Sequence, residues 1–275
     1  MSPIMIIAEK EIRDALRNRW ILAATLLLAA LALCLGFLGS APTGSVKVEP
    51  LTVTVVSLSS LSVFLIPLIA MLLSYDALIG EMERGTMALL LSYPVSRSQV
   101  LIGKFAGHCA VLALATGAGY GLAGVALQLG YGGGAAAWKA FVLLIGASIL
   151  LGAAFLSIGY LISAKAGERG TAAGLAVGVW LFFVLIFDMA LLGVLVADSK
   201  HALSASVVEM ILLFNPADVY RLLNLTGYEN TAAYAGMAGL SGQISLGMPL
   251  LLAAQAAWVA VPFAWAVRVF AKRQV

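Results

Sequence analysis

Residues 171–196, TAAGLAVGVWLFFVLIFDMALLGVLV, form an apolar run interrupted by a single charged side chain, that of Asp188. A helix rises about 1.5 Å per residue, so a run of this length exceeds the roughly 30 Å thickness of a bilayer hydrocarbon core. One charge is too few to solvate the surface of a water-facing helix. The stretch therefore predicts a transmembrane helix.

Similar apolar runs recur along the whole 275-residue chain. Hydrophobic residues make up 62% of the sequence and charged residues 11%, whereas a soluble domain carries about 25% charged residues. This composition excludes soluble enzymes, nucleic-acid-binding modules and disordered proteins. We expect an all-α polytopic membrane protein with a single domain, 1–275. The predicted transmembrane helices are six: 20–39, 55–80, 100–129, 138–163, 171–196 and 248–268.

The positions of lysine and arginine predict the orientation. Most of the 16 basic residues lie in or beside four segments: 1–19, 81–99, 164–170 and the C-terminal tail. The positive-inside rule places such segments in the cytoplasm. We therefore expect a multi-pass membrane protein with both termini in the cytoplasm; the family resemblance given below implies a bacterial inner membrane. The apolar segment from Ile21 to about Leu38, preceded by a long charged leader, exceeds the 7–15 residues of a signal-peptide core, so the first span is expected to be retained.

The leader has the periodicity of an amphipathic helix. Ile4, Ala8, Ile12, Ala15 and Leu16 share one helical face, and charged side chains occupy the opposite face. We expect an elbow helix over 1–19 that lies in the lipid headgroup region.

Glycines at four-residue spacing predict places where two helices approach closely inside the membrane. Such sets are Gly103 with Gly107, Gly117 with Gly121, and Gly170 with Gly174 and Gly178.

The longest connection runs from 198 to 247, on the expected periplasmic side. Typical connections have about 4–6 residues, so we expect this one to contain helices of its own. Asp218 lies three residues before Arg221, a spacing at which the two side chains pair on a helix. These helices either seal the outer mouth of the bundle or dock another protein, and the pattern alone leaves both open.

A catalytic site is hard to assemble from these residues. The nucleotide-binding pattern GxxxxGK[ST] and the metalloprotease pattern HExxH are both absent, so the chain is not expected to be an enzyme. Asp76 and Asp188 are the acids that an intramembrane aspartyl hydrolase would need, but the sequence context of that class is missing. Asp188 is expected to face the bundle interior, where it either hydrogen-bonds a neighbouring helix or lines a translocation pathway, because charged groups inside a membrane are costly and usually functional. A passive channel or scaffold is the other alternative.

The most informative cytoplasmic stretch is residues 81–104, EMERGTMALLLSYPVSRSQVLIGK. Gly85 is expected to break the helix that leaves the second span, Thr86 to cap a new short helix, and Pro94 to end it. Ser96 and Gln99 have the spacing of a capping box that opens the third span. The short helix would present apolar side chains either to a partner's groove or to lipid headgroups.

This stretch resembles the coupling-helix region of ABC-2-type transporter permeases, and the elbow helix and predicted topology resemble the same family over the whole chain. The resemblance implies a permease fold of the type V exporter kind. It implies a homodimer in membrane lipid, with two cytoplasmic ABC ATPase subunits that carry ATP and Mg²⁺, and no cofactor on this chain. Leucines of the short helix would be buried against the ATPase, with Glu83 and Arg84 at the rim. The implied ATPase-coupling residues are Glu81, Glu83, Arg84, Gly85, Thr86, Leu89, Leu90, Leu91, Pro94 and Arg97.

Residues 215–221, NPADVYR, resemble the branch of the family that serves maturation of nitrous oxide reductase. That resemblance implies a cargo for assembly of the copper centres of the reductase, either a sulfur species or copper. It also implies a periplasmic β-helical partner that is NosD-like. The expected docking residues for this partner are Asn215, Pro216, Asp218, Tyr220 and Arg221.

Overall fold

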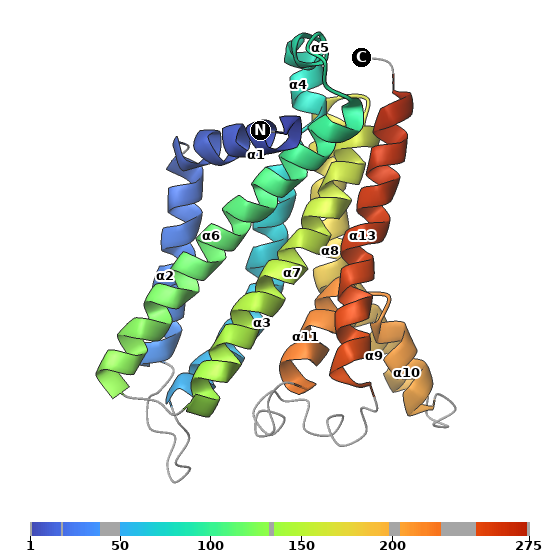
Figure 1. Ribbon diagram of the computed structural model, residues 1–275. Coiled ribbons are helices and arrows are strands. Elements are labelled where there is room, and N and C mark those ends of the chain that lie inside the picture. The colour runs from blue at the N-terminus through green and yellow to red at the C-terminus, as the bar shows by residue number, and fades with distance from the viewer. Residues whose placement is uncertain are drawn as a thin grey trace.

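The structure is a computed structural model that describes residues 2–17, 19–38, 50–131, 135–197, 204–226 and 246–273. Over these residues the chain is helical, without a β-strand, and the long helices run side by side as a bundle (Figure 1). This confirms the predicted all-α class.

The helices follow the predicted pattern, with bounds as follows: α1 Pro3–Arg17, α2 Arg19–Leu38, α3 Pro50–Ser74, α4 Ile79–Glu83, α5 Thr86–Leu91, α6 Arg97–Tyr131, α7 Ala135–Lys165, α8 Arg169–Leu181, the π-helix η1 Phe182–Ile186, α9 Phe187–Ala197, α10 Ala205–Leu212, α11 Pro216–Thr226 and α13 Met248–Lys272. Five described stretches are long and apolar enough to cross a membrane: Ser57–Glu83, Arg97–Gly130, Trp138–Lys165, Arg169–Ala197 and Met248–Lys272. The first predicted span, 20–39, coincides with α2, whose described apolar stretch is the shorter Thr25–Cys34. The described residues thus give five candidate spans, and the sixth predicted span, at α2, stays a prediction.

Helix α7 lies at the centre of the bundle, and α3, α6 and α13 pack around it (Figure 1). A helix with neighbours around it needs apolar side chains on most of its surface, and Phe141 and Phe155 of α7 are fully buried. The Phe155 ring lies edge-on to Phe183 of η1, with 6.1 Å between centroids, and Phe183 lies 5.3 Å from Trp258 of α13. This row of rings ties η1 and α13 to the centre.

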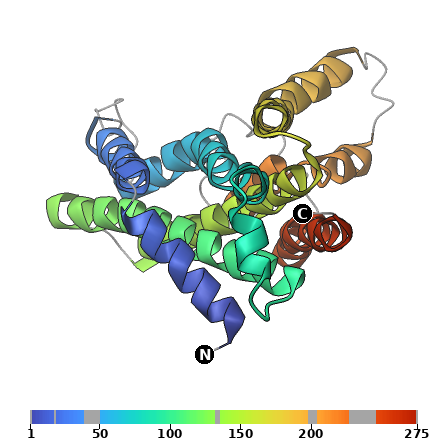
Figure 2. The same ribbon diagram turned by 90° about the horizontal axis from the view of Figure 1, so that it is seen from above.

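The stretch α8–η1–α9 lies at the edge of the bundle (Figure 2). Many of its large apolar side chains are exposed. At Gly170, Gly174 and Gly178, nothing described lies within 4 Å of the position that a Cβ would take. The predicted close approach is therefore wrong within a single chain at these glycines, and the same holds at Gly117 and Gly121.

Helix α1 lies crosswise over one end of α6 (Figures 1 and 2). Two glycines of α6 make room for it, as their spacing predicts. A Cβ at Gly103 would lie 2.8 Å from Ile7 Cβ, and one at Gly107 would lie 2.6 Å from Glu11 Cβ. The face of α1 that packs on the protein carries Ile7, Glu11 and Ala15, whereas Leu16 of the predicted lipid-facing side is exposed.

Both ends of the chain and the α4–α5 turn lie at one end of the bundle, and α10 and α11 lie at the other (Figure 1). Helices α10 and α11 confirm that the 198–247 connection contains helices of its own. Residues 198–203 and 227–245 of that connection lie outside the described part of the chain.

Candidate functional site

The α4–α5 turn depends on Gly85, as the sequence predicts. Its φ of 72° lies in the left-handed region, which costs glycine little. Gly85 also occupies the N-cap position of α5, so the prediction that Thr86 caps this helix is wrong. Thr86 instead donates its hydroxyl to the Glu81 carbonyl at 3.2 Å, which holds the start of α5 against α4.

Ser96 and Gln99 form the predicted capping box at the start of α6. The Ser96 N–H donates to Gln99 Oε1 at 2.9 Å, and the Gln99 N–H donates to Ser96 Oγ at 3.2 Å. Pro94 lies in the short connection between α5 and this box. Helix α5 is therefore held at both ends, and it presents a fixed surface.

The three leucines of α5 do not share one environment. Leu89 is 66% exposed, whereas Leu90 and Leu91 are half-buried and pack around the fully buried Met87. Successive residues of a helix point about 100° apart, so three in a row cannot all face a partner. Leu89 therefore offers the most exposed surface of the three, and the ATPase contacts of Leu90 and Leu91 stay predictions. Tyr93, which the sequence reasoning missed, is 63% exposed and lies one turn beyond Leu89.

Glu83 and Arg84 lie on the exposed rim of this turn, where the sequence reasoning placed them. Glu83 Oε1 accepts the backbone N–H of Arg169 at 2.7 Å, which links α4 to the start of α8. Arg169 in turn pairs with Asp76, with 2.6 Å between Nε and Oδ1, and the Arg84 guanidinium lies 3.9 Å from Asp76 Oδ2. The Asp76 carboxylate thus has two cations beside it.

Two predicted coupling residues point into the chain instead. Arg97 donates to the carbonyl oxygens of Phe270 and Arg273 and so ties the start of α6 to the end of α13. Glu81 turns toward the buried Lys104 and accepts from its Nζ at 2.6 Å. Both residues therefore have partners inside the chain, and their contact with an ATPase stays a prediction.

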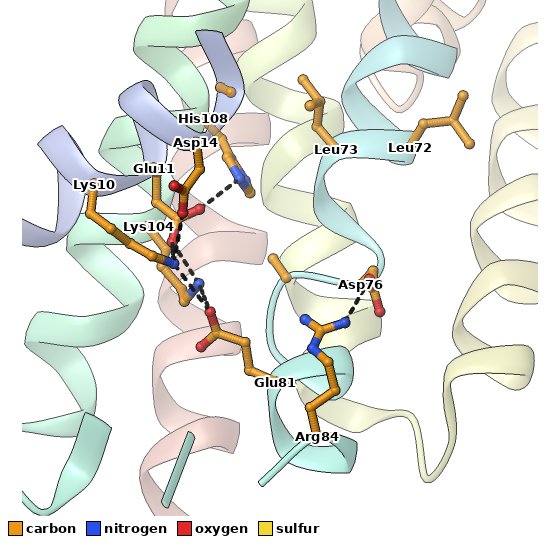
Figure 3. Close-up of a pocket in the computed structure, with 12 residues that line it drawn as sticks. Lys10, Glu11, Asp14, Leu72, Leu73, Asp76, Glu81, Arg84, Lys104 and His108 are labelled. Atoms are coloured by element: carbon orange, nitrogen blue, oxygen red, sulfur yellow. Dashed lines mark hydrogen bonds and ion pairs between the residues drawn. The ribbon is translucent and has the colours of Figure 1, made fainter. Parts of the chain in front are cut away.

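An open pocket of about 310 Å³ lies beside α1, α4 and α6 at this end of the bundle (Figure 3). Its lining is mostly charged, with both signs present: Lys10, Glu11, Asp14, Ala15, Leu72, Leu73, Asp76, Ala77, Glu81, Arg84, Lys104 and His108.

Lys104 is the most buried charge of this pocket, with 2% of its surface exposed. Its Nζ lies 2.8 Å from Glu11 Oε1 on α1 and 2.6 Å from Glu81 Oε1 on α4 (Figure 3). His108 Nε2 lies 3.4 Å from Glu11 Oε2, and the Tyr160 hydroxyl of α7 meets His108 Nδ1 at 2.8 Å. The sequence reasoning did not assign Glu11 or His108 a partner, because the pairing depends on how α1 crosses α6.

The environment shifts the pKa of Glu11 on α1. Burial alone raises this pKa, but the hydrogen bond to His108 and the positive charge of Lys104 outweigh burial and hold the pKa well below its ordinary value. Glu11 is therefore ionised at neutral pH.

The NPADVYR segment is packed inside the chain. Asn215, Pro216 and Tyr220 are buried, and the Tyr220 hydroxyl meets Ser148 of α7 at 3.1 Å. Asn215 donates from Nδ2 to the carbonyl of Phe183 at 2.8 Å, within the π-helix, where the wider turn leaves backbone groups in need of partners. Buried side chains have no surface to offer another protein, which corrects the docking prediction for these three residues.

Arg221 pairs with two acids at once. Its guanidinium lies 2.7 Å from Asp218 Oδ1, as the three-residue spacing predicts, and it also bonds Asp188 Oδ2 of α9. Asp188 is thus joined to α11 by an ion pair, which is the first of the two alternatives expected for it. The pair links α11 to α9, and the pathway role of Asp188 stays a prediction.

The two intramembrane aspartates lie far apart. Asp76 pairs with Arg169, the first residue of the helical stretch Arg169–Ala197, while Asp188 lies 19 residues further along it. At about 1.5 Å per residue this separates them by roughly 28 Å. The geometry does not bring these acids together as an aspartyl hydrolase would require.

Comparisons with known proteins identify the family. A family described as "ABC-2 family transporter protein" matches residues 5–275. The chain is 44% identical over 277 residues to a probable ABC transporter permease protein NosY of Pseudomonas aeruginosa, covering 100% of both chains. It is 43% identical over 276 residues to a protein of the same name from Stutzerimonas stutzeri, covering 99% of each chain. The chain therefore belongs to the ABC-2 family of transporter permeases, as a multi-pass membrane protein similar to NosY over its full length.

Proposed function

We propose that this chain is the membrane-spanning subunit of an ABC transporter, in which two copies pair in the membrane and each holds one cytoplasmic ABC ATPase subunit. ATP and Mg²⁺ bind to the ATPase, and this chain converts its movement into movement of the spans. Membership of the ABC-2 family supports the proposal, since both relatives are named as probable ABC transporter permeases.

The observation that supports the proposal best is the exposed end of α5, which we call the tip of α5 and define as Leu89 and the following Tyr93. Leu89 on α5 and Tyr93 just beyond its end are large and exposed, and the exposed Glu83 and Arg84 lie at the rim. An apolar centre with a charged rim is the usual composition of a protein-binding surface. This tip lies at the same end as both termini, which is the end that the positive-inside rule assigns to the cytoplasm (Figure 1).

The more specific function concerns nitrous oxide reductase. Identity of 43–44% to proteins named NosY supports a role in supplying a sulfur species or copper to the copper centres of that enzyme. A NosD-like periplasmic partner belongs to the same proposal. Because residues 215–221 are largely buried, its contact would be on α10, where Met210 is 62% exposed and the following Phe214 is 70% exposed.

Co-purification tests the proposed function. The tagged chain is expressed with the ATPase encoded in the same organism, and the ratio of the two subunits is measured in the purified complex, together with its ATP hydrolysis. Leu89→Asp is expected to lose the ATPase, because a charge placed in an apolar groove is desolvated without a partner. Leu89→Met, which keeps the apolar contact, is expected to retain it.

Two outcomes would count against this assignment. If the Leu89→Asp variant purified with the same ratio of ATPase to permease as the unmutated chain, α5 would not be the docking element. An unmutated chain that purifies without any ATPase, although both are expressed, would favour a passive channel or scaffold.

A further inference from the structure

Lys104 connects two elements that are packed on different neighbours. Helix α1 packs on α6 and α2, whereas α4 packs on α5 and α8. Lys104 Nζ reaches Glu11 of α1 at 2.8 Å and Glu81 of α4 at 2.6 Å. Lys10 adds an outer contact, since its Nζ lies 3.6 Å from Glu81 Oε1. Charges therefore bridge the elbow helix and the α4–α5 turn, beside an apolar cluster that includes Ile7 and Met87.

Burial of Lys104 makes its two ion pairs costly to separate. A lysine with 2% of its surface exposed has lost its water, so it needs both carboxylates to remain charged at an acceptable free-energy cost. Separating α4 from α1 would leave Glu81 or Glu11 without its cation, beside the pocket that both carboxylates line. Such a pair resists opening more strongly than a surface ion pair does.

Glu11 itself is held from two directions. Lys104 binds one carboxylate oxygen and His108 binds the other, and Tyr160 of α7 bonds the far nitrogen of His108. The neighbouring glycines, Gly103 and Gly107, seat α1 on α6 at van der Waals distance. The elbow helix is consequently fixed to α6 along its buried face, and it has little freedom to slide.

Building on the proposed function, we propose that Lys104 is a positioning residue that makes α1 and the α4–α5 turn move as one body with the start of α6. A displacement of α5 by the ATPase would then pass to the elbow helix, at the lipid headgroups, through the pair Glu81–Lys104–Glu11. We call this set of three side chains the elbow clamp.

The test measures distances between spin labels at positions 17 and 88 of the full chain in lipid nanodiscs, after alanine has replaced Cys34 and Cys109. Arg17 ends α1, and Ala88 lies on α5, and both are exposed. Glu81→Ala opens the α4 side of the elbow clamp and leaves Lys104 paired with Glu11, so the elbow helix stays seated. Glu83→Ala is the matched control, because it removes an acid of the same helix that bonds Arg169 instead of Lys104.

Without the ATPase, we expect the distance distribution to widen about twofold or more in Glu81→Ala, because the two elements then sample separate positions. We expect the distance distribution of Glu83→Ala to be as narrow as that of the unmutated chain. We expect the same of Glu81→Gln, because its amide oxygen still accepts a hydrogen bond from Lys104. A Glu81→Ala distribution as narrow as that of the unmutated chain would overturn the elbow clamp.

A second measurement uses the complex with the ATPase, trapped with nucleotide. The unmutated chain is expected to keep its 17-to-88 distance on trapping, whereas a change in that distance would show that the two elements separate and would contradict the proposal. If no ATPase binds, the proposed function fails, while the first measurement still decides whether the elbow clamp exists.

Discussion

At the scale of single residues, each end of the bundle places one buried or half-buried cation between two carboxylates. Lys104 forms ion pairs with Glu11 and Glu81, and Arg221 forms ion pairs with Asp188 and Asp218. Removing a cation that is shared in this way leaves two desolvated acids, which costs more than removing either acid. The cations are therefore the sensitive positions at both ends.

The pKa of Glu11 predicts how the stability of the chain depends on pH. Because the folded-state pKa lies well below the unfolded value of about 4.3, the ionised form stabilises the fold above about pH 4.3, and this stabilisation is lost as pH falls toward the folded pKa. Glu11→Gln should lower stability by about 1.5–3 kcal/mol at pH 7. The difference in unfolding temperature between the unmutated chain and Glu11→Gln should shrink as pH is lowered from 6 to 3. A difference that stays constant over this range would contradict the assigned ionisation.

Asp188 and Arg221 offer a second residue-scale test. Asp188→Asn leaves Arg221 paired with Asp218, so we expect a loss of only about 1–2 kcal/mol. Arg221→Met leaves both acids without a cation, and we expect a loss of about 3–5 kcal/mol. Thermal unfolding of the purified variants measures both. An Asp188→Asn variant with unchanged unfolding temperature and abolished transport would instead favour the pathway role.

At the scale of elements, the contact of α1 with α6 depends on the absence of side chains at Gly103 and Gly107. Gly107→Ala brings a Cβ to 2.6 Å from Glu11 Cβ, so α1 must shift, and we expect destabilisation of about 1–3 kcal/mol. Gly121→Ala, on the same helix, meets nothing within 4 Å and should be neutral or stabilising by up to about 1 kcal/mol. If Gly107→Ala and Gly121→Ala changed the unfolding temperature equally, the close contact of α1 with α6 at Gly107 would be contradicted.

The elements differ in how far the sequence predicts them. The capping box at Ser96 and Gln99 and the break at Gly85 are predictable, because each depends on residues within a few positions along the chain. The inward direction of Glu81 is not, since it depends on Lys104, which is 23 residues away. Burial of Asn215 follows from the π-helix in the fifth span, and the apolar composition of 171–196 carries no signal for that wider turn.

At the scale of the whole molecule, the two ends of the bundle have different exposed groups. The end with both termini carries α5, and the opposite end carries α10 and α11 (Figure 1). We predict that a membrane-impermeant maleimide labels Met210→Cys in intact cells and labels Ala88→Cys only after permeabilisation, because the basic segments keep their end in the cytoplasm. Both variants carry alanine at Cys34 and Cys109. Labelling of position 88 in intact cells would contradict the predicted orientation and place this end of the bundle outside the cytoplasm.

The central claim, that the tip of α5 contacts the ATPase, is tested most directly by crosslinking from position 93. A photoreactive phenylalanine analogue replaces Tyr93, which is exposed and aromatic, and the same analogue replaces Phe214 at the opposite end as the control. We expect irradiation to join the ATPase subunit to the chain from position 93 and not from position 214. Crosslinks from position 93 that reach only lipid or a second copy of the chain, with the ATPase present, would contradict the claim.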